Sequence, residues 1–543
     1  MKHPLFAPAL GSLLFTVALS ARAADFYVDP ASGSAAGDGS AAKPWKTLEE
    51  VIAAGLFGST VKAGDTVHLL TGFHGEMMVS GGSYSPPISV VAGAGQSPKL
   101  RRARFSNTSG WLLRGVSVSP SHGGTGTGSI TMVEIQTSSS KVTVEDSEVF
   151  SVADASGWGA TEWLAAHSGV SVRGAESVVR GNKIRNVRFG ISADAAKVMI
   201  DGNVVENFSA DGLRGLGDDQ TFQYNLVKNS YLDDSLDSNH DDGFQSWSVG
   251  PGGVGTGEVK NMTLRGNVII NSENPAQPLK GTLQGIGCFD GTFVGWVVEN
   301  NVVITNHWHG ISLYGARDSR IVNNTVIDTD DAKPGPPWIM VNDHKDGTPS
   351  QNVVVRNNLA TDYDVKGTNV TQDHNVTLSG TFAGYFVNPS APAWDLRLLK
   401  TSPAVDQGST DLAPPLDADK IQRPQGAGID LGAYEWHDPS VVPTGGTGGG
   451  GGAAGGAGGS AGAGASTSGG SGGGGGAGAT AGGAGAGAGG SPASGGKGAK
   501  DDGGDDGGCG CRVPGSEREP SRHAGLLLSA LAFGALRRRR PAK

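Results

Sequence analysis

The chain has 543 residues, of which 42 are Lys or Arg, 52 are Asp or Glu and 90 are Gly, so its formal net charge is −10. This acidic balance gives no reason to expect a nucleic-acid partner, because such proteins gather an excess of basic side chains. Cys288 is the one cysteine outside the C-terminal tail, so no disulfide framework is available to stabilise the folded part.

The first 23 residues have the pattern of a signal peptide. Lys2 and His3 precede an apolar run over residues 13–19, and Ala21-Arg22-Ala23 forms a small-x-small cleavage site. We therefore expect residues 1–23 to be removed on export.

A short helix is predicted near the start of the mature chain. Thr47 and Glu50 have the spacing of a capping box. The apolar face of this helix would consist of Leu48, Val51 and Ile52. Such a helix would cover the open edge of the structure that follows, where residues 64–67 predict the first strand.

Two sequence marks return at nearly regular intervals through the middle of the chain. Asparagines that precede a short apolar pair are Asn182, Asn203, Asn225, Asn267, Asn301, Asn324 and Asn358. Glycines that precede an apolar residue are Gly169, Gly190, Gly212, Gly243, Gly285 and Gly310. Both series advance by about 22 residues with some longer steps, which indicates a stacked solenoid with loops inserted in some turns.

The segments between these marks predict strands. They are short, apolar and mostly β-branched, as in residues 198–200, 262–264, 297–298 and 353–355. A turn of about 22 residues holds about three such strands with their corners. Asn tolerates the left-handed backbone that a sharp corner needs, and its amide can bond to Asn on the turns above and below.

This pattern resembles the right-handed parallel β-helix superfamily, which includes pectate lyases and many polysaccharide-acting enzymes. The alternative is a β-sandwich with Asn in its loops, but register kept over seven asparagines favours a coil. We predict an all-β domain over residues 24–437, a single-stranded right-handed parallel β-helix with an N-terminal capping helix. Its coil is expected from about residue 65 to residue 435. Residues 26–47 and 396–435 resemble the opening and closing segments of secreted proteins with this fold.

The composition changes abruptly after the predicted domain. Residues 438–508 are dominated by Gly, Ala and Ser and predict a disordered linker. Residues 509–543 contain Cys509 and Cys511, an apolar run of 13 residues and the cluster Arg537–Arg540. The run is shorter than the roughly 20 residues that span a bilayer. This tail resembles the MYXO-CTERM sorting signal of myxobacteria, which implies cleavage, a lipid anchor in the outer membrane and display at the cell surface.

Side-chain alternation along the strands predicts which residues face outward. Aligning the turns gives one outward column of Ser171, Ser192, Arg214, Gln245, Gly287 and Ser312. A second column consists of Arg173, Asp194, Leu216, Trp247, Phe289 and Tyr314. Because successive turns lie about 4.8 Å apart, we expect Arg214, Gln245 and Trp247 to share one patch with His240 and Asp242. His309 is expected about two turns away.

An acidic cluster leads directly into this patch. Asp233, Asp234, Asp237, Asp241 and Asp242 lie within ten residues, in an inserted loop. One reading is a solvated turn whose carboxylates cap the backbone. We favour a functional site, because the loop is longer than the coil requires and catalytic residue types follow it. Carboxylates at this density also suit Ca²⁺, although EF-hand spacing is absent from the sequence. The candidate ligands are Asp233, Asp234, Asp237 and Asp241.

Two enzyme mechanisms fit these residues. A polysaccharide lyase needs a base, either His240 or Lys280, and a group such as Arg214 or Ca²⁺ that neutralises the uronic carboxylate. An inverting glycosidase needs two carboxylates about 6.5–9.5 Å apart, which Asp211 with Asp242, or the pair Asp218 and Asp219, would supply.

The polygalacturonase pattern is half present. Residues 209–212 and His309-Gly310 resemble it, but residues 320–322 read Arg-Ile-Val in place of Arg-Ile-Lys. We favour a lyase that cleaves uronic-acid-containing polysaccharide, and we expect it to be a monomer. The catalytic candidates are His240, Asp242, Arg214, Asp211 and His309, and the glycan-binding candidates are Gln245, Trp247, Tyr314 and Lys280. A third reading is a surface adhesin or glycan-binding scaffold without turnover.

Overall fold

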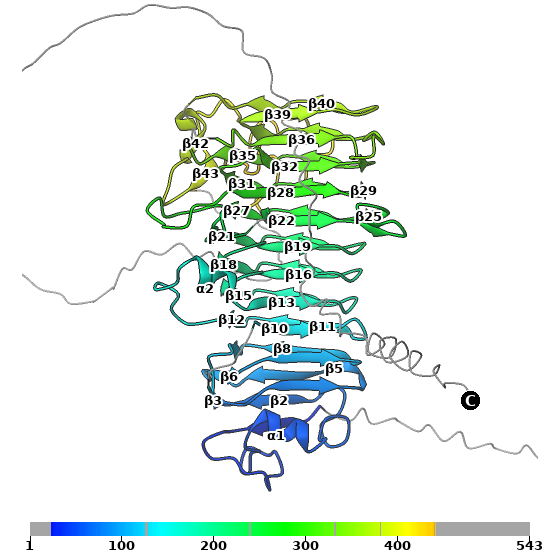
Figure 1. Ribbon diagram of the computed structural model, residues 1–543, viewed down its shortest axis with the longest axis vertical. Coiled ribbons are helices and arrows are strands. Elements are labelled where there is room, and N and C mark those ends of the chain that lie inside the picture. The colour runs from blue at the N-terminus through cyan, green and yellow to red at the C-terminus, as the bar shows by residue number, and fades with distance from the viewer. Residues whose placement is uncertain are drawn as a thin grey trace, which may run out of the picture. The chain divides into compact units, whose positions relative to one another are not determined.

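The computed structural model describes residues 23–124, 129–237, 240–330, 333–380, 382–438 and 440. Residues 1–22, most of the predicted linker and the whole sorting segment lie outside the described residues. No helix among the described residues is long and apolar enough to cross a membrane. The folded part is a coil of stacked turns, with the first residues at one end (Figure 1).

Each full turn of the coil contributes one strand to each of three long parallel sheets. The 13-stranded sheet contains β1 (Asp25–Val28), β2 (Thr66–Leu69), β5 (Ser83–Ala92), β8 (Ser109–Arg114), β11 (Ser140–Glu145), β14 (Val178–Arg180), β17 (Met199–Asp201), β20 (Thr221–Gln223), β26 (Thr263–Arg265), β30 (Val297–Glu299), β34 (Arg320–Val322), β37 (Val354–Arg356) and β40 (Thr371–Asp373). The predicted right-handed parallel β-helix, with its first coil strand near residue 66, is thereby confirmed.

The next sheet along each turn has 12 strands. It contains β3 (Gly72–Phe73), β6 (Pro98–Leu100), β9 (Ser117–Val118), β12 (Glu148–Phe150), β15 (Lys183–Val187), β18 (Val204–Phe208), β21 (Leu226–Ser230), β27 (Val268–Ile270), β31 (Val302–Thr305), β35 (Thr325–Asp328), β38 (Leu359–Ala360) and β41 (Val376–Thr377). The coil ends with β40 and β41, so the expectation that it continues to about residue 435 is wrong.

The third sheet has 11 strands and carries the candidate site. It contains β4 (Met77–Ser80), β7 (Ala103–Ser106), β10 (Thr131–Ile135), β13 (Ser168–Val172), β16 (Ile191–Ala193), β19 (Leu213–Gly215), β22 (Asp241–Trp247), β28 (Leu283–Asp290), β32 (His309–Tyr314), β36 (Trp338–Asn342) and β39 (Asp362–Val365). Outside the three sheets lie the pair β23 (Val249–Gly250) and β24 (Gly253–Val254), the set β25 (Glu258–Lys260), β29 (Thr292–Val294) and β33 (Ala316–Arg317), helices α1 (Leu48–Ala53) and α2 (Ala160–Leu164), and a 3₁₀ helix at Phe382–Gly384.

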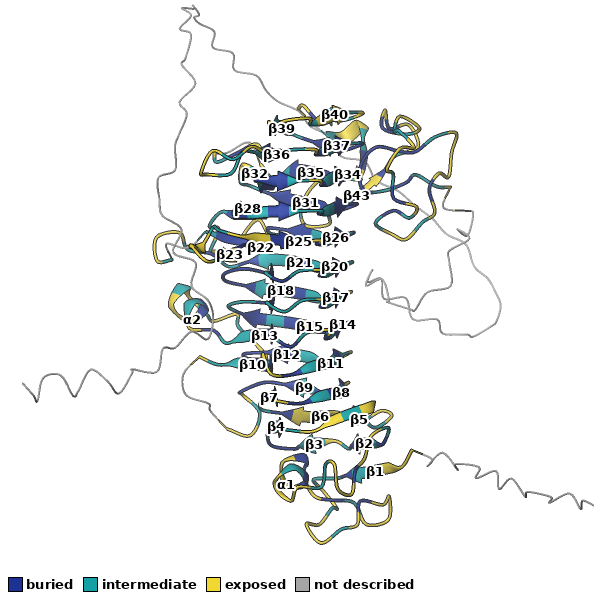
Figure 2. Ribbon diagram, turned by 90° about the vertical axis from the view of Figure 1, so that its right-hand side faces the viewer, coloured by how far each residue is buried: buried dark blue, intermediate teal, exposed yellow. Residues whose placement is uncertain are grey.

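The interior of the coil is a stack of apolar side chains, one above another on successive turns. In the 13-stranded sheet the central residue of each short strand points inward: Val179, Ile200, Phe222, Leu264, Val298 and Ile321. Figure 2 shows the resulting dark band of buried residues along the strands. This stacking explains why the strands are short and β-branched, since each inward residue must fill one layer of the core.

The predicted asparagines form a continuous hydrogen-bonded ladder inside one corner. The Asn182 amide donates to Asn203 Oδ1 over 3.0 Å, and the same bond repeats from Asn203 to Asn225. The ladder continues through Asn267, Asn301, Asn324 and Asn358, and it also includes Asn375, which the sequence interpretation missed. Each amide donates a second bond to a backbone carbonyl, so the stacking predicted for Asn182, Asn203 and Asn225 is confirmed.

The left-handed residue at this corner is not the ladder asparagine. Positive φ angles occur one residue earlier, at Gly181, Gly202, Tyr224, Gly266, Asn300, Asn323, Asn357 and His374. The left-handed residue turns the chain, and the following Asn then points its amide inward to the ladder. The expectation that the ladder asparagines themselves adopt this conformation is therefore wrong.

Helix α1 covers the first turns of the coil, as the sequence predicts. The Thr47 side chain accepts a hydrogen bond from the backbone N–H of Glu50, and Leu48 and Val51 are buried. The helix therefore lies over the end of the core, at the blue end in Figure 1. A covered end leaves fewer unpaired strand groups to pair with another chain.

Residues 386–436, the C-terminal clasp, pack along the outer face of the 12-stranded sheet. The clasp begins with the antiparallel pair β42 (Phe386–Asn388) and β43 (Asp395–Leu398). Its apolar side chains cover outward-facing residues of that sheet, including Ile304, Ile327 and Leu359. The segment predicted to close the coil thus lies beside the coil.

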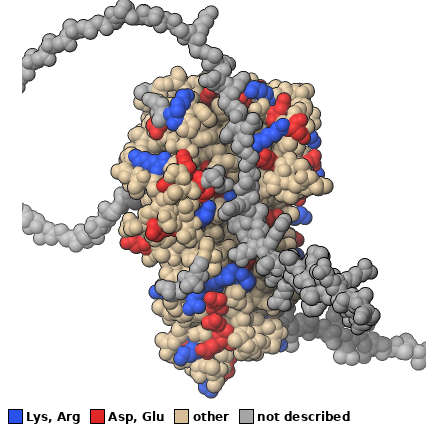
Figure 3. Space-filling view, viewed as in Figure 1, with Lys and Arg blue, Asp and Glu red and all other residues tan. Residues whose placement is uncertain are grey.

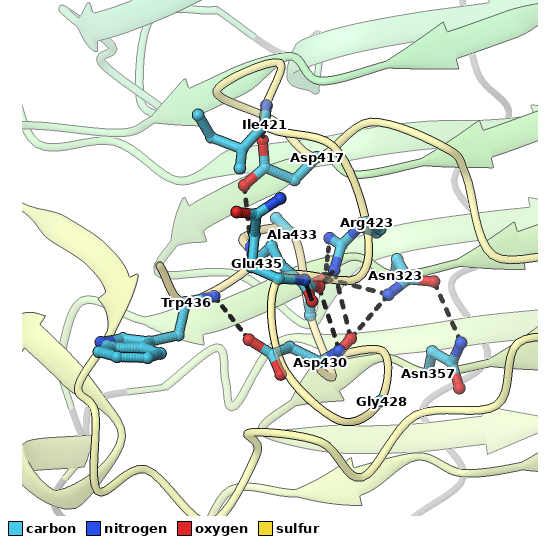
Figure 4. A network of polar contacts seen from close by, with 12 residues as sticks. Asn323, Asn357, Asp417, Ile421, Arg423, Gly428, Asp430, Ala433, Glu435 and Trp436 are labelled. Atoms are coloured by element: carbon cyan, nitrogen blue, oxygen red, sulfur yellow. Dashed lines mark hydrogen bonds and ion pairs between the residues drawn. The ribbon is translucent and has the colours of Figure 1, made fainter. Parts of the chain in front are cut away.

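Buried polar contacts hold the clasp against the coil corners at Asn323 and Asn357 (Figure 4). The amides of Asn323 and Asn357 donate to the backbone carbonyls of Asp430 and Ser409 over 3.0 and 2.8 Å. Arg423 and Glu435 form an ion pair of 2.6 Å whose side chains are both fully buried. Because each charge is paired, the clasp keeps these groups in the interior without an isolated buried ion.

Charged side chains on the coil pair across turns. Arg102 and Arg104 both contact Glu134, and Arg173 contacts Asp194. In the space-filling view, Lys and Arg lie beside Asp and Glu on the face shown (Figure 3). Partly exposed pairs of this kind contribute little stability each, so packing and the ladder are the main sources of stability.

Candidate functional site

The candidate site lies on the outer face of the 11-stranded sheet, at β19, β22, β28 and β32. All seven residues of β22 are buried, and so are seven of the eight residues of β28. Strand alternation turns Phe244 and Ile286 into the core. The opposite side chains are therefore buried although they lie on the outside of the coil.

Two outward positions in each turn bring polar residues together in pairs. The first position is the residue before the marked Gly, and the second lies three residues later. On successive turns the two positions hold Asp211 with Arg214, Asp242 with Gln245, Gln284 with Gly287, and His309 with Ser312. Strand pairing stacks these pairs on successive turns. The alignment of these columns made from the sequence matches the register of the strands.

The first pair is a fully buried ion pair. Arg214 Nε contacts Asp211 Oδ2, and the exposed fractions of the two side chains are 2% and 0%. The Arg214 guanidinium also lies 4.3 Å from the centroid of the Phe189 ring and 5.3 Å from that of Trp247. Arg214 is thus enclosed by its carboxylate and two rings, which places it beneath the surface.

The second pair centres on the Asp242 carboxyl. Its Oδ2 lies 3.2 Å from His240 Nδ1 and accepts a hydrogen bond of 3.0 Å from Gln245 Nε2. Its backbone N–H donates to Asp211 Oδ1 over 3.0 Å. Complete burial raises the pKa of Asp242 to about 7, against the opposing effect of His240. The His240 side chain is 31% exposed, so this network reaches the surface at the imidazole.

Buried polar atoms without a hydrogen-bond partner gather at this place. In the part of the chain that the structure describes there are eleven such side-chain atoms. Six of them belong to Asp241, Asp242, Gln245, Ser246, Trp247 and Gln284. An unpaired buried polar group is costly, so a concentration of them points to a functional site.

A missing side chain makes room for Asp242. Gly287 occupies the outward column directly beside Gln245. A Cβ on Gly287 would collide with Asp242 Oδ1 and would lie 3.0 Å from Gln284 Oε1. The two unpartnered oxygens therefore converge over this glycine, where only a residue without a side chain fits.

Aromatic and histidine rings continue the site toward β32 and β36. Phe289 lies 5.9 Å from His240, 4.6 Å from His309 and 5.5 Å from Tyr314, measured between ring centroids. His309 Nδ1 lies 2.9 Å from Ser312 Oγ and 3.3 Å from Trp338 Nε1. Burial, followed by the nearby charges of other basic groups, lowers the pKa of His309 to about 3, so its ring is neutral.

Several predicted site residues lie together and others do not. Asp211, Arg214, His240, Asp242 and Gln245 form one cluster, and His309 with Tyr314 adjoins it through Phe289. Trp247 is 2% exposed, so its ring lies beneath the surface and does not form the sugar platform that was expected. The physical reason is that alternation sets the direction of a side chain but not what covers it.

Lys280 and the alternative carboxylates lie apart from the cluster. Lys280 is exposed in the loop before β28, where it pairs with Leu232 in a short bridge. Asp218 and Asp219 lie at the corner before β20 and bond to Lys260 and Asn261. Neither placement brings these groups to His240.

The predicted metal ligands make separate contacts. Asp233 accepts from Ser235, Asp234 from Thr282, and Asp237 pairs with Arg188 over 2.8 Å. Asp241 is buried, and burial raises its pKa well above the ordinary value. Among the described residues, no group of three or more His, Cys, Asp or Glu side chains is arranged to hold a metal ion. A calcium site stays a prediction from the sequence.

Sequence reasoning missed several residues of this face. The predicted column stacks Trp247 on Phe289, but the strands pair Trp247 with Asp290, because the register shifts after Ser246. Gln284 was given no role. Trp338 and Lys345 were not identified, because they follow an insertion that interrupts the Gly series. Ile339 is an apolar core residue that pairs with Ile311. This repeat is the sequence signal that extends the columns to Trp338 and Lys345.

Comparisons with known proteins agree with the coil. Residues 168–333 match the family described as right handed beta helix region. Among solved structures, pectate lyase Pel9A is 14% identical, with 77% of this chain and 98% of that chain covered and a TM-score of 0.45. XylC in complex with xylose is 8% identical, with 62% and 75% covered and a TM-score of 0.37. The lacto-N-biosidase of Eubacterium ramulus is 13% identical, with 64% and 68% covered and a TM-score of 0.35. No curated protein matches the sequence.

Proposed function

We propose that the protein cleaves a uronic-acid-containing polysaccharide by β-elimination at the outer face of β22, β28 and β32. The observation that carries the proposal is the pair of Asp242 and His240. A buried carboxyl holds Nδ1 of an imidazole that is 31% exposed. This arrangement fixes the orientation of His240 and connects a surface base to a buried acid, as general acid–base catalysis requires.

His240 is the base in this reaction. It removes the proton from the carbon next to the uronic carboxylate, and the electron pair forms a carbon–carbon double bond as the glycosidic bond breaks. The leaving oxygen takes up a proton from solvent water, and His240 then releases its own proton to solvent. Asp242 stabilises the imidazolium that forms on His240, and Gln245 holds Asp242 in place through its bond of 3.0 Å.

The substrate carboxylate needs a positive partner, and Arg214 does not reach it. Arg214 is 2% exposed and paired with Asp211, so we assign it the role of holding Asp211 beneath the site. Lys345, 47% exposed and 2.9 Å from Asp290, is the cation that we assign to neutralisation. Asp290 follows Phe289 at the end of β28, so this ion pair puts Lys345 next to the strand that carries Phe289.

Hydrolysis is the second candidate, favoured by one observation. The raised pKa of Asp242 suits a general acid that is protonated near neutral pH. An inverting hydrolase also needs a second carboxylate that activates water. Asp211 is fully buried and paired with Arg214, so we rank elimination above hydrolysis.

We also propose that the protein acts outside the cytoplasm, on a glycan at the cell surface. The export pattern in residues 1–23 and the sorting pattern in residues 509–543 support this proposal. Mass spectrometry of surface material tests it. Mature protein without residues 1–23 and without the Arg537–Arg540 cluster is expected, and surface protein that retains the arginines would contradict it.

A substrate screen tests the reaction. The domain is incubated with uronic and with neutral polysaccharides, and both ultraviolet absorbance and new reducing ends are followed. Elimination leaves an unsaturated product, so absorbance and reducing ends should rise together on a uronic polymer. Reducing ends without absorbance would establish hydrolysis, and binding without either signal would establish a glycan-binding scaffold.

A further inference from the structure

A pocket lies outside the proposed catalytic face, at the C-terminal ends of β21 and β27 in the 12-stranded sheet. It has a volume of about 520 Å³, within the range of about 300–1,000 Å³ that is usual for small-molecule sites. Its lining includes Tyr231 at the end of β21, Glu273 and Asn274 after β27, and Pro392 from the C-terminal clasp. We propose that this pocket binds a neutral sugar unit of a polysaccharide.

The aromatic wall of the pocket is rigid. The Tyr231 ring stacks on Trp163 with 4.4 Å between centroids and an interplanar angle of 16°. Trp163 is 2% exposed and packs edge-on against Trp158 at 4.9 Å. An aromatic ring held in this way offers a sugar an apolar face with a polar hydroxyl at its edge. The Tyr231 hydroxyl makes no hydrogen bond within the described part of the chain.

The polar wall presents groups that suit hydroxyls. Glu273 Oε2 accepts from Lys228 over 2.8 Å and from Asn229 over 3.0 Å, which fixes the carboxylate and leaves Oε1 for a ligand. Asn274 Oδ1 accepts from the backbone of Ala276, while its NH₂ group donates no bond within the described residues. The residues that line the pocket thus carry one acceptor, one donor and the Tyr231 hydroxyl, which matches the mixed donors and acceptors of a sugar.

The charge of the pocket selects a neutral unit. Of its lining residues within the described part of the chain, Glu273 alone is charged. Its neighbour Lys228 offsets the charge, but a uronic carboxylate in the pocket would still meet the Glu273 oxygens. We therefore expect this pocket to take a neutral sugar, in contrast to the catalytic face.

The pocket and the catalytic face share two loops. Residues 231–240 begin at the pocket and end at His240, and residues 271–282 begin at the pocket and end at β28. The loops are joined where Gly281 N–H donates to Leu232 O over 3.0 Å and Thr282 N–H donates to Asp234. A glycan chain held at the pocket would thus lie beside the loops that carry the proposed base.

A binding experiment with defined oligosaccharides tests the proposal. Xylotetraose, mannotetraose, cellotetraose and tetragalacturonate are titrated into the intact domain. Saturation-transfer NMR reports contact, and tryptophan fluorescence reports the surroundings of Trp163. At least one neutral tetrasaccharide should bind, and tetragalacturonate should bind more weakly. Tyr231→Phe and Asn274→Ala should each raise Kd about fivefold or more, because each removes one hydrogen bond to the ligand.

Two further variants separate this pocket from other sites. Tyr27→Phe is the matched control, since Tyr27 is a half-buried tyrosine stacked on His68 at 5.1 Å, on β1. It should leave Kd unchanged. Because binding is measured without turnover, the result does not depend on the proposed elimination. The proposal is overturned if no neutral tetrasaccharide binds, if tetragalacturonate binds most tightly, or if Tyr231→Phe and Asn274→Ala bind as well as Tyr27→Phe.

Discussion

The asparagine ladder and the Asp242 cluster are both columns of buried polar side chains that run along the coil. In the ladder, the amide of Asn225 donates to Asn267 Oδ1 and to Ile200 O and accepts from Asn203. In the cluster, Asp242 Oδ1, Gln245 Oε1 and Gln284 Oε1 have no partner. A closed network stabilises a fold and specifies its register, whereas an incomplete one costs stability. The comparison teaches that the ladder maintains the coil, whereas the unpaired groups of the cluster support the catalytic site that we propose.

The largest expected effect is on turnover. His240→Ala should reduce the rate on the true substrate by about 100-fold or more, the usual scale for a general base. The domain should stay folded, because the imidazole is at the surface. His68→Ala is the matched control, since His68 pairs with Asp25 over 2.8 Å on the first turns. Equal rates for the two variants would show that the cluster is not catalytic.

A substitution in the asparagine ladder should lower the stability of the domain without changing its turnover. Asn225→Ala removes the acceptor of Asn203 and the donor to Ile200 O, which leaves several buried groups unpaired. We expect the free energy of unfolding to fall by about 3 kcal/mol, measured by urea denaturation. Gln223→Ala, on the outside of the same turn, should cost less than about 1 kcal/mol. Similar losses for both variants would mean that the ladder contributes no more to stability than an ordinary side chain on the outside of the coil.

The pH dependence of stability should distinguish Asp242 from an asparagine. Its pKa rises from 3.8 to about 7 in the fold, so the folded state holds a proton that the unfolded chain releases. The stabilisation is complete below about pH 4 and is lost as pH rises toward 7, by at most about 1.4 kcal/mol per pH unit. Asp242→Asn cannot titrate and should show a flatter profile in this window. The free energy of unfolding of both proteins is measured by urea denaturation across this pH range. If the two pH profiles coincide, the shifted pKa of Asp242 is contradicted.

The smallest effect is expected at the outer corners that hold the clasp. Asn323→Gly keeps the left-handed backbone but loses the amide bonds to Asp430 O and Gly432 O. Unfolding should become easier by about 1 kcal/mol, the value of an ordinary hydrogen bond. Limited proteolysis should also release the clasp more readily. An unchanged cleavage rate would show that the apolar contacts alone hold it.

The fold could be predicted from the sequence because its layers repeat. Each ladder asparagine must stack on its neighbour, so seven of them kept a register that is visible without a structure. Asn375 escaped notice because its step from Asn358 is only 17 residues and β41 is two residues long. The sequence also contains a signal for the position of the clasp, which is a pair of consecutive asparagines at three corners. At Asn300-Asn301, Asn323-Asn324 and Asn357-Asn358 the first asparagine faces outward to the clasp and the second joins the ladder.

The site could be predicted only in part. Alternation and register placed Asp211, Arg214, Asp242 and Gln245 on one outward face, because both follow from strand geometry. Burial could not be predicted in the same way, since it depends on which neighbouring side chains and segments cover a residue. Trp247 is therefore covered, whereas Trp308, in a loop of no fixed register, is 41% exposed.

A crystal structure of Asp242→Asn with a uronic oligosaccharide would test the central claim most directly. This variant preserves the shape of the side chain while it prevents turnover. We predict a sugar ring against His240 and His309, with its carboxylate toward Lys345. A sugar bound only elsewhere on the coil, with the His240 face unoccupied at saturating ligand, would contradict the account.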